Sequence, residues 1–234
     1  MPFIPVSETR ITLHRSVTED GEIALRQLTS PQGNLHFEVV VNGTFLFSTY
    51  NRDSERALAR LAVYPVLTLR RPLHVLIGGL GIGYTLGAVL EYKEVCSVTV
   101  VEKEKTIVDW CKTYFGPYNG RSIEDPRVSI AVGDFLSFIR NTRIAYDSMC
   151  LDLDNGPDWL VWEENRVLYE ESGLNQIKNV LKSGGCLGIW SSSRANLFED
   201  RLRRVFKNAS VHTISTTEMG KEVEYHIYTA TRQH

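Results

Sequence analysis

The stretch Val75-Leu76-Ile77-Gly78-Gly79-Leu80-Gly81-Ile82-Gly83 decides the fold, because an apolar strand runs directly into a turn that has little side-chain bulk. Glycine adopts positive φ without strain and lets a ligand approach the backbone closely. The residues that follow, 84–90, are predicted as a helix, whose first N–H groups lack partners within the helix. A glycine turn that binds nothing is the alternative. The candidate ligand contacts are Gly78, Gly79, Gly81 and Gly83.

The spacing of the glycines separates two kinds of nucleotide site. The dinucleotide fingerprint G-x-G-x-x-G fails here, because its last position falls on Tyr84 or on Leu86. The pattern G-x-G-x-G does fit, from Gly79 to Gly83, and it is typical of methyltransferase-type folds. A nicotinamide-dependent reductase is therefore the least favoured enzyme class.

Outward from the turn, the next two predicted strands each end near an acidic residue. The first is followed by Glu102, and a carboxylate at this place accepts the ribose hydroxyls of a nucleoside. The second is followed by Asp134 and Phe135, which can accept from an adenine amino group and form an apolar wall. The alternatives are an exposed strand-end acid for Glu102 and a helix N-cap for Asp134. Together with the turn, these residues predict an adenosine site.

Strand-like and helix-like segments alternate from Pro72 onward. Such alternation predicts an α/β fold with a doubly wound, mostly parallel sheet that binds ligands at the carboxyl ends of its strands. The segments before Asp53 read instead as short strands, and Asn42-Gly43 is a strong hairpin signal among them. We expect an N-terminal β subdomain, residues 1–52, and a seven-stranded nucleoside-binding domain, residues 53–234.

Composition narrows the classes of partner. A net charge of −2 and a pI near 6.3 argue against a dedicated nucleic-acid binder, whose surface is usually basic. The cysteines show no C-x-x-C spacing and the histidines are dispersed, so no metal site is expected. No secretory signal and no apolar stretch of membrane-spanning length is evident, so we expect a cytoplasmic protein without membrane contact.

The segment after the fourth predicted strand, 152–159, is the candidate reaction side. Asp152 is the first choice, and Asp154 the second, for orienting an amine or taking its proton, because carboxylates attract a cationic acceptor. A simple turn is the alternative, since Asp, Asn, Gly and Pro all favour turns. Aromatic side chains nearby can enclose an alkylammonium, or can equally be core residues. The candidate substrate contacts are Asn155, Trp159, Tyr169 and Trp190.

Several of these motifs resemble the spermidine synthase family, a branch of the class I S-adenosylmethionine-dependent methyltransferase superfamily. The matching motifs are the glycine turn, Val101-Glu102, Gly133-Asp134, Tyr146-Asp147 leading to Asp152, and Leu181-Lys182-Ser183-Gly184-Gly185. The resemblance implies a Rossmann-like fold after a small β domain and a transferase activity. It also implies S-adenosylmethionine or its decarboxylated form as co-substrate, a small-molecule amine as acceptor, no metal, and a homodimer.

The chain departs from that family at three places. Gly81 stands where the family carries an Asp for the donor ammonium, so we expect methyl transfer, with aminopropyl transfer as the alternative. The stretch Asp53–Ala59 lacks the Tyr and His of the family's Asp-Glu-x-x-Tyr-His-Glu. The family's Asp-Ser-Ser/Thr-Asp-Pro becomes Asp152-Leu153-Asp154-Asn155-Gly156-Pro157. A nucleoside-binding scaffold without catalysis is the alternative from another class.

Overall fold

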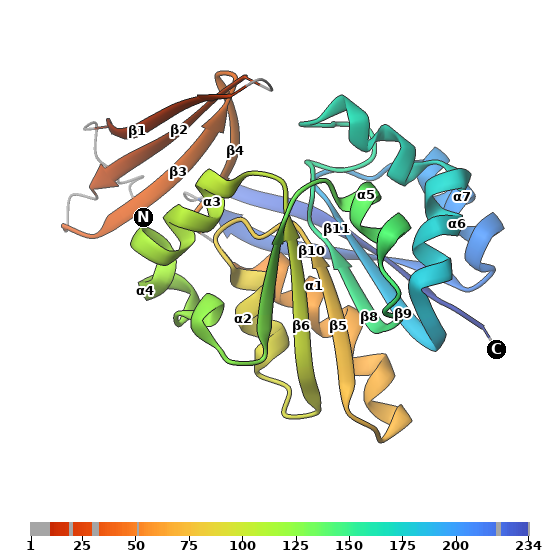
Figure 1. The fold of residues 1–234 in the computed structure, drawn as a ribbon. Helices are drawn as coiled ribbons and strands as arrows, with labels where there is room; N and C mark the ends of the chain where they lie inside the picture. Colours follow the sequence, from red (N-terminus) through yellow and green to blue (C-terminus); the bar gives the residue numbers. More distant parts are fainter. Residues whose placement is uncertain (1–9, 19–20, 30–32, 51, 219–220, 234) are drawn as a thin grey trace. The chain divides into compact units, whose positions relative to one another are not determined.

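A computed structural model describes residues 10–18, 21–29, 33–50, 52–218 and 221–233. The chain divides into two compact units, which Figure 1 shows as ribbons. One unit comprises the chain up to Arg52 together with Ser215–Val223, and the other comprises Asp53–Ile214 together with Glu224–His234.

The first unit is built on a four-stranded antiparallel sheet in the order β1-β2-β3-β4. Asn42 and Gly43 have φ of 50° and 79° and form the predicted hairpin turn between β3 and β4. Leu25 and Val39, which pair across β2 and β3, are fully buried and form part of this unit's apolar face. The strands are β1 (Arg10–Thr18), β2 (Gly21–Thr29), β3 (Leu35–Val41) and β4 (Thr44–Ser48).

A seven-stranded sheet in the order β10-β11-β9-β8-β5-β6-β7 forms the centre of the second unit, which holds all of it except residues 215–218 of β10 and 221–223 of β11. β9, β8, β5, β6 and β7 are parallel to one another, and β11 pairs antiparallel with β9. This arrangement confirms the predicted doubly wound, mostly parallel fold. The strands are β5 (Leu73–Gly78), β6 (Val95–Glu102), β7 (Val128–Val132), β8 (Tyr146–Leu151), β9 (Leu181–Ser191), β10 (Ala209–Glu218) and β11 (Lys221–Thr231).

Helical segments connect these strands (Figure 1). The α-helices are α1 (Asp53–Val63), α2 (Tyr84–Leu90), α3 (Lys105–Trp110), α4 (Gly116–Asn119), α5 (Phe135–Asn141), α6 (Glu171–Val180) and α7 (Asn196–Phe206). The shorter helical turns are η1 (Tyr64–Leu69), η2 (Cys111–Phe115), η3 (Ser122–Glu124) and η4 (Glu163–Tyr169).

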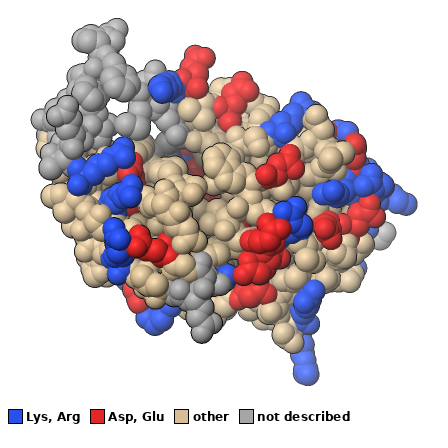
Figure 2. Space-filling model, turned by 90° about the horizontal axis from the view of Figure 1, so that it is seen from above, with Lys and Arg blue, Asp and Glu red and all other residues tan. Residues whose placement is uncertain are grey.

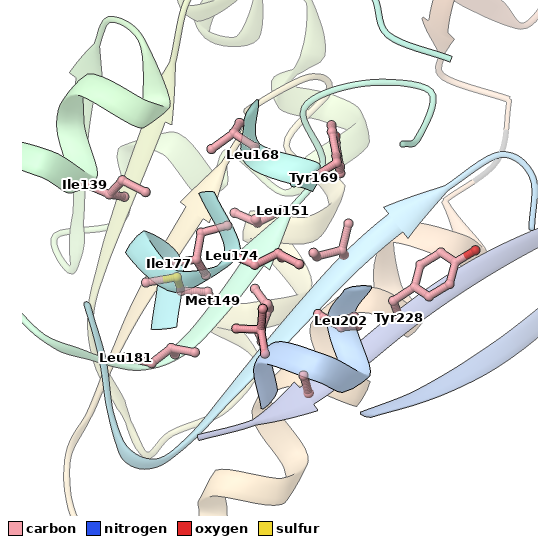
Figure 3. Close-up of a cluster of buried hydrophobic side chains, with 14 of the residues drawn as sticks. Ile139, Met149, Leu151, Leu168, Tyr169, Leu174, Ile177, Leu181, Leu202 and Tyr228 are labelled. Carbon is pink, nitrogen blue, oxygen red and sulfur yellow. The ribbon is translucent and has the colours of Figure 1, made fainter. Parts of the chain in front are cut away.

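Two packing contacts show why helices cover both faces of the sheet. Leu58 of α1 lies so close to Gly188 of β9 that a Cβ at Gly188 would be 2.9 Å from its Cδ1. On the other face, apolar side chains of α5, α6 and α7 pack with Met149 and Leu151 of β8 (Figure 3). Burying apolar area of this kind is the main stabilising contribution to such a domain.

The end of α6 is held by the C-terminal part of the chain. α6 ends at Val180, and the stretch Lys182–Gly185 belongs to the first half of β9. The Arg232 guanidinium donates to the carbonyls of Lys178, Asn179 and Leu181 and so satisfies the end of this helix.

The strand order decides where the site lies. β8, β5, β6 and β7 are neighbours and parallel, so their carboxyl ends meet at the same edge of the sheet. The glycine turn, Glu102, Asp134 and Asp152 each follow one of these strand ends. On the molecular face shown in Figure 2, basic and acidic side chains are interspersed.

Candidate active site

The glycine turn adopts a backbone that only glycine tolerates well. Gly79, Gly81 and Gly83 have φ of 87°, 50° and 90°. A Cβ at Gly79 would lie 2.0 Å from the main-chain oxygen of Asp152. The N–H of Asp152 also donates to the carbonyl of Gly78 at 2.8 Å. The turn and the start of the candidate reaction loop are therefore packed directly against each other.

Glu102 anchors the turn from the end of β6. Its Oε2 accepts from the N–H of Leu80 at 2.8 Å, and its Oε1 accepts from the N–H of Glu104 at 2.9 Å. Burial raises the pKa of Glu102, while these backbone donors lower it. Each carboxylate oxygen has more than one lone pair, so both can also accept from ribose hydroxyls.

Asp134 and Phe135 lie at the start of α5. Asp134 is exposed, and its Oδ1 accepts from the N–H of Ser137 at 2.7 Å, which is the N-cap alternative. Phe135 is only 2% exposed, and its ring would lie 2.9 Å from a Cβ at Gly78. Phe135 therefore packs in the core beneath the turn, where Gly78 leaves room for its ring, and its contact with adenine stays a prediction.

Asp152 lies half-buried at the end of β8. Its Oδ2 accepts from the Thr85 hydroxyl of α2 at 3.4 Å. Burial, followed by the negative charge of Glu55 and a smaller effect of Glu102, raises the pKa of Asp152 to about 8. A cation bound beside this carboxyl would lower its pKa and favour the carboxylate form.

Asp154 makes contacts of a structural kind. Its Oδ1 accepts from the N–H groups of Val161 at 2.9 Å and Trp162 at 3.2 Å. Its Oδ2 accepts from Asn165 Nδ2 at 2.8 Å and from the Tyr169 hydroxyl at 3.1 Å. Four donors around a 4%-exposed side chain point to a role in holding the loop 154–169, in contrast to the expected contact with an amine.

The expected aromatic substrate contacts lie in different environments. Tyr169 is 4% exposed and packs edge-on against Phe198, whereas Trp159 is 56% exposed. Figure 3 shows Tyr169 among the buried apolar side chains. Trp190 lies 5.2 Å from Tyr225 between ring centroids, and its buried Nε1 has no hydrogen-bond partner among the described residues. The contact of these aromatic side chains with a substrate stays a prediction.

Asn155 contributes its main chain to the same region. Its carbonyl accepts from the N–H of Ser192 at 2.9 Å and from the Ser192 hydroxyl at 2.6 Å. A Cβ at Gly156 would lie 2.1 Å from the Ser191 hydroxyl, so the loop follows the end of β9 closely. These contacts connect the loop that begins at Asp152 to the strand that carries Trp190.

Sequence reasoning missed several polar residues that support the site. Thr85 contacts Asp152, and Glu55 changes its pKa. Lys103 lies 4.2 Å from the centroid of the Trp162 ring and pairs with Glu164 at 3.3 Å, which ties the loop to the end of β6. Glu55 lies in the stretch Asp53–Ala59, which the sequence comparison with the family had already singled out, so it could have been predicted. Thr85 and Lys103 carry no motif, because only the fold brings them to the strand ends.

The part of the chain that the structure describes shows neither a metal cluster nor a membrane-spanning helix. Among them, no group of three or more His, Cys, Asp or Glu side chains is placed to hold a metal ion. No helix within the described ranges is long and apolar enough to cross a membrane.

A mostly parallel sheet with a glycine turn after its first strand and an acid after its second defines a class I S-adenosylmethionine-dependent type of nucleoside-binding fold. Within that class, the Spermine/spermidine synthase domain family matches residues 58–223. The chain therefore belongs to this family.

Relatives and solved structures agree with this assignment. The chain is 28% identical over 180 residues to a polyamine aminopropyltransferase of Saccharolobus islandicus, a match that covers 74% of this chain and 58% of the relative. It is 28% identical over 155 residues to the Sulfolobus acidocaldarius polyamine aminopropyltransferase, covering 63% of this chain and 50% of the relative. The chain thus spans little more than half the length of these relatives.

The fold is also that of spermidine synthases. The Thermotoga maritima spermidine synthase superposes with a TM-score of 0.73 at 17% identity, over 94% of this chain and 72% of that chain. A spermidine synthase in complex with the transition state analogue AdoDATO superposes with a TM-score of 0.76 at 18% identity, over 94% and 73%.

Proposed function

We propose that this chain is a polyamine aminopropyltransferase, which transfers the aminopropyl group of decarboxylated S-adenosylmethionine to a small amine. The family match and the names of the curated relatives support this choice over methyl transfer, which Gly81 alone had favoured. The observation that carries the proposal is Asp152, whose main chain packs against Gly79 and whose carboxyl, with a raised pKa, accepts from Thr85 of the helix that follows the glycine turn.

The glycine turn and Glu102 would bind the adenosine part of the donor. Gly79 and Gly81 are partly exposed and carry no side chain that would block a ligand, and Glu102 already fixes the turn through the N–H of Leu80. Asp134 at the end of β7 would accept from the adenine amino group through an oxygen beyond its N-cap contact.

Asp152 would receive the acceptor. The amine nitrogen attacks the propyl carbon next to the sulfonium, the C–S bond breaks, and its electron pair stays on sulfur to give methylthioadenosine. A new C–N bond forms and the nitrogen loses one proton, which the Asp152 carboxyl would take in its ionised form. The negative charge of Glu55 would attract the cationic acceptor, and the enzyme otherwise contributes position.

The test is turnover measured by mass spectrometry. Decarboxylated S-adenosylmethionine with a panel of diamines and polyamines should give methylthioadenosine and an acceptor heavier by one aminopropyl group. Asp152→Asn should lower kcat/KM at least about 100-fold, the usual contribution of a general base. S-adenosylmethionine serves as the second donor, because Gly81 removes a family carboxylate. A methylated product without any aminopropyl product, or no product from either donor, would contradict the proposal.

A further inference from the structure

A buried polar contact to the glycine turn is made by Asn119, the last residue of α4, and Ser122, the first residue of η3. Asn119 Nδ2 donates to the carbonyl of Ile82 at 2.6 Å. The Ser122 hydroxyl donates to the carbonyl of Gly83 at 3.4 Å, and the N–H of Ser122 donates to Asn119 Oδ1 at 3.2 Å. Asn119 and Ser122 are 8% and 5% exposed, so this pair is screened from solvent.

Gly83 and Gly87 leave the space that Asn119 occupies, because a side chain at either position would lie too close to it. A Cβ at Gly83 would lie 2.8 Å from Asn119 Nδ2, and a Cβ at Gly87 would lie 3.2 Å from the Asn119 carbonyl. Cys111 reinforces the same place, because its Sγ lies 3.3 Å from Asn119 Nδ2 and 3.6 Å from the carbonyl of Ile82. These contacts fix the position of the Asn119 side chain, which in turn contacts the glycine turn.

The turn is gripped from two sides. On one side, the Glu102 carboxylate accepts from the N–H of Leu80 in the turn. On the other side, the Asn119 side chain donates to the carbonyl of Ile82 in the turn. Between these contacts, the N–H of Gly83 donates to the carbonyl of Leu80 at 2.8 Å and closes the turn. Loss of the Asn119 donor would leave a buried carbonyl poorly satisfied, which favours rotation of the peptide between Ile82 and Gly83.

We propose that Asn119 is a positioning residue for the nucleoside donor: it holds the glycine turn in the conformation that receives the nucleoside, without contacting the nucleoside itself. This inference rests on the proposed function, since the turn is the donor site only under that proposal. A turn that populates other conformations binds the donor more weakly, in proportion to the population that is lost. The acceptor, which is received at Asp152, is unaffected.

The first test uses binding and kinetics with Asn119→Ser, Ser122→Ala and the control Asn175→Ser. Asn175 is an exposed residue of α6 that donates to the carbonyl of Glu171, so it matches the chemistry at a remote place. Calorimetry with methylthioadenosine should show about tenfold weaker binding for Asn119→Ser, or about 1.4 kcal/mol. Ser122→Ala should show a smaller loss in the same direction, and the control none.

Steady-state kinetics separates positioning from general damage. The KM for the donor should rise by the same factor as the dissociation constant, while kcat at saturating donor and the KM for the acceptor stay constant. A fall in kcat with an unchanged donor KM would mean that Asn119 only supports folding, and would overturn the inference.

Hydrogen exchange of the protein without ligand distinguishes failure of this inference from failure of the proposed function. The turn 78–84 should exchange faster in Asn119→Ser, and in Ser122→Ala if the first variant does not fold, while β9 is unchanged. If the unsubstituted protein binds no methylthioadenosine but the turn exchanges faster, the proposed function fails and the positioning of the turn stands. Unchanged exchange and unchanged donor affinity in the folded variants would overturn the inference.

Discussion

Asp152→Asn should lower activity but, as the pH rises from 5 to 8, should increase the free energy of unfolding relative to the unsubstituted protein. The pKa of Asp152 is raised from 3.8 to about 8, mainly by burial and by the charge of Glu55. Below pH 3.8 the carboxyl is protonated in both the folded and the unfolded chain. Between pH 3.8 and about 8 the folded chain keeps the proton that the unfolded chain releases, so the contribution of Asp152 to stability falls as pH rises.

The magnitude follows from that shift. One pKa unit corresponds to about 1.4 kcal/mol, so the three pH units from 5 to 8 give a ceiling of about 4 kcal/mol. Because Asp152 is only half-buried and its surroundings relax on ionisation, the expected change is about 1–2 kcal/mol. Asparagine does not titrate, so the variant does not lose this part of the free energy of unfolding as the pH rises.

Denaturant unfolding at pH 5, 6.5 and 8 measures the effect. The free energy of unfolding of Asp152→Asn, relative to the unsubstituted protein, should rise by about 1–2 kcal/mol between pH 5 and pH 8. Asp200→Asn, an exposed substitution on α7, is the matched control and should show a constant difference. A pH-independent difference for Asp152→Asn would refute the reasoning that its carboxyl is buried beside other acids.

Three further predictions concern the turn, the loop and the opposite edge of the sheet. Gly79→Ala should abolish methylthioadenosine binding in calorimetry and lower the melting temperature, because its Cβ would lie 2.0 Å from a main-chain oxygen, and unchanged binding would contradict the geometry. Asp154→Ala should raise the acceptor KM and cost about 1–3 kcal/mol in denaturant unfolding, since four donors lose their acceptor; an effect on kcat alone would argue instead for direct catalysis. Asp147→Ala should cost about 3–5 kcal/mol, because Arg71 at 2.7 Å and Lys182 at 2.8 Å lose a fully buried partner. The folded fraction of this last variant should keep normal donor affinity, and weaker binding would mean that the two edges of the sheet are coupled.

The sequence predicted the parts of the site that depend on the chain's periodicity. Glu102 and Asp152 follow apolar strands, and parallel strands bring such positions to the same edge. The hairpin at Asn42-Gly43 was predictable for a similar local reason, since both residues tolerate positive φ.

The remaining features depend on packing that a sequence pattern does not encode. Phe135 follows a strand end just as a ligand contact would, but the space beneath Gly78 takes its ring into the core. Asp154 and Asp152 are nearly adjacent in sequence, and only the fold of the loop surrounds Asp154 with donors. Asn119 ends the short helix α4 and belongs to no motif, so its contact with Ile82 becomes visible only in three dimensions.

A crystal structure of the protein with methylthioadenosine tests the central claim most directly. The account predicts that the nucleoside lies along the backbone of residues 79–83, with its ribose hydroxyls at hydrogen-bonding distance, about 2.6–3.2 Å, from Glu102. The thioether sulfur should point toward Asp152. A nucleoside bound away from these strand ends, or one whose ribose does not contact Glu102, would contradict the account.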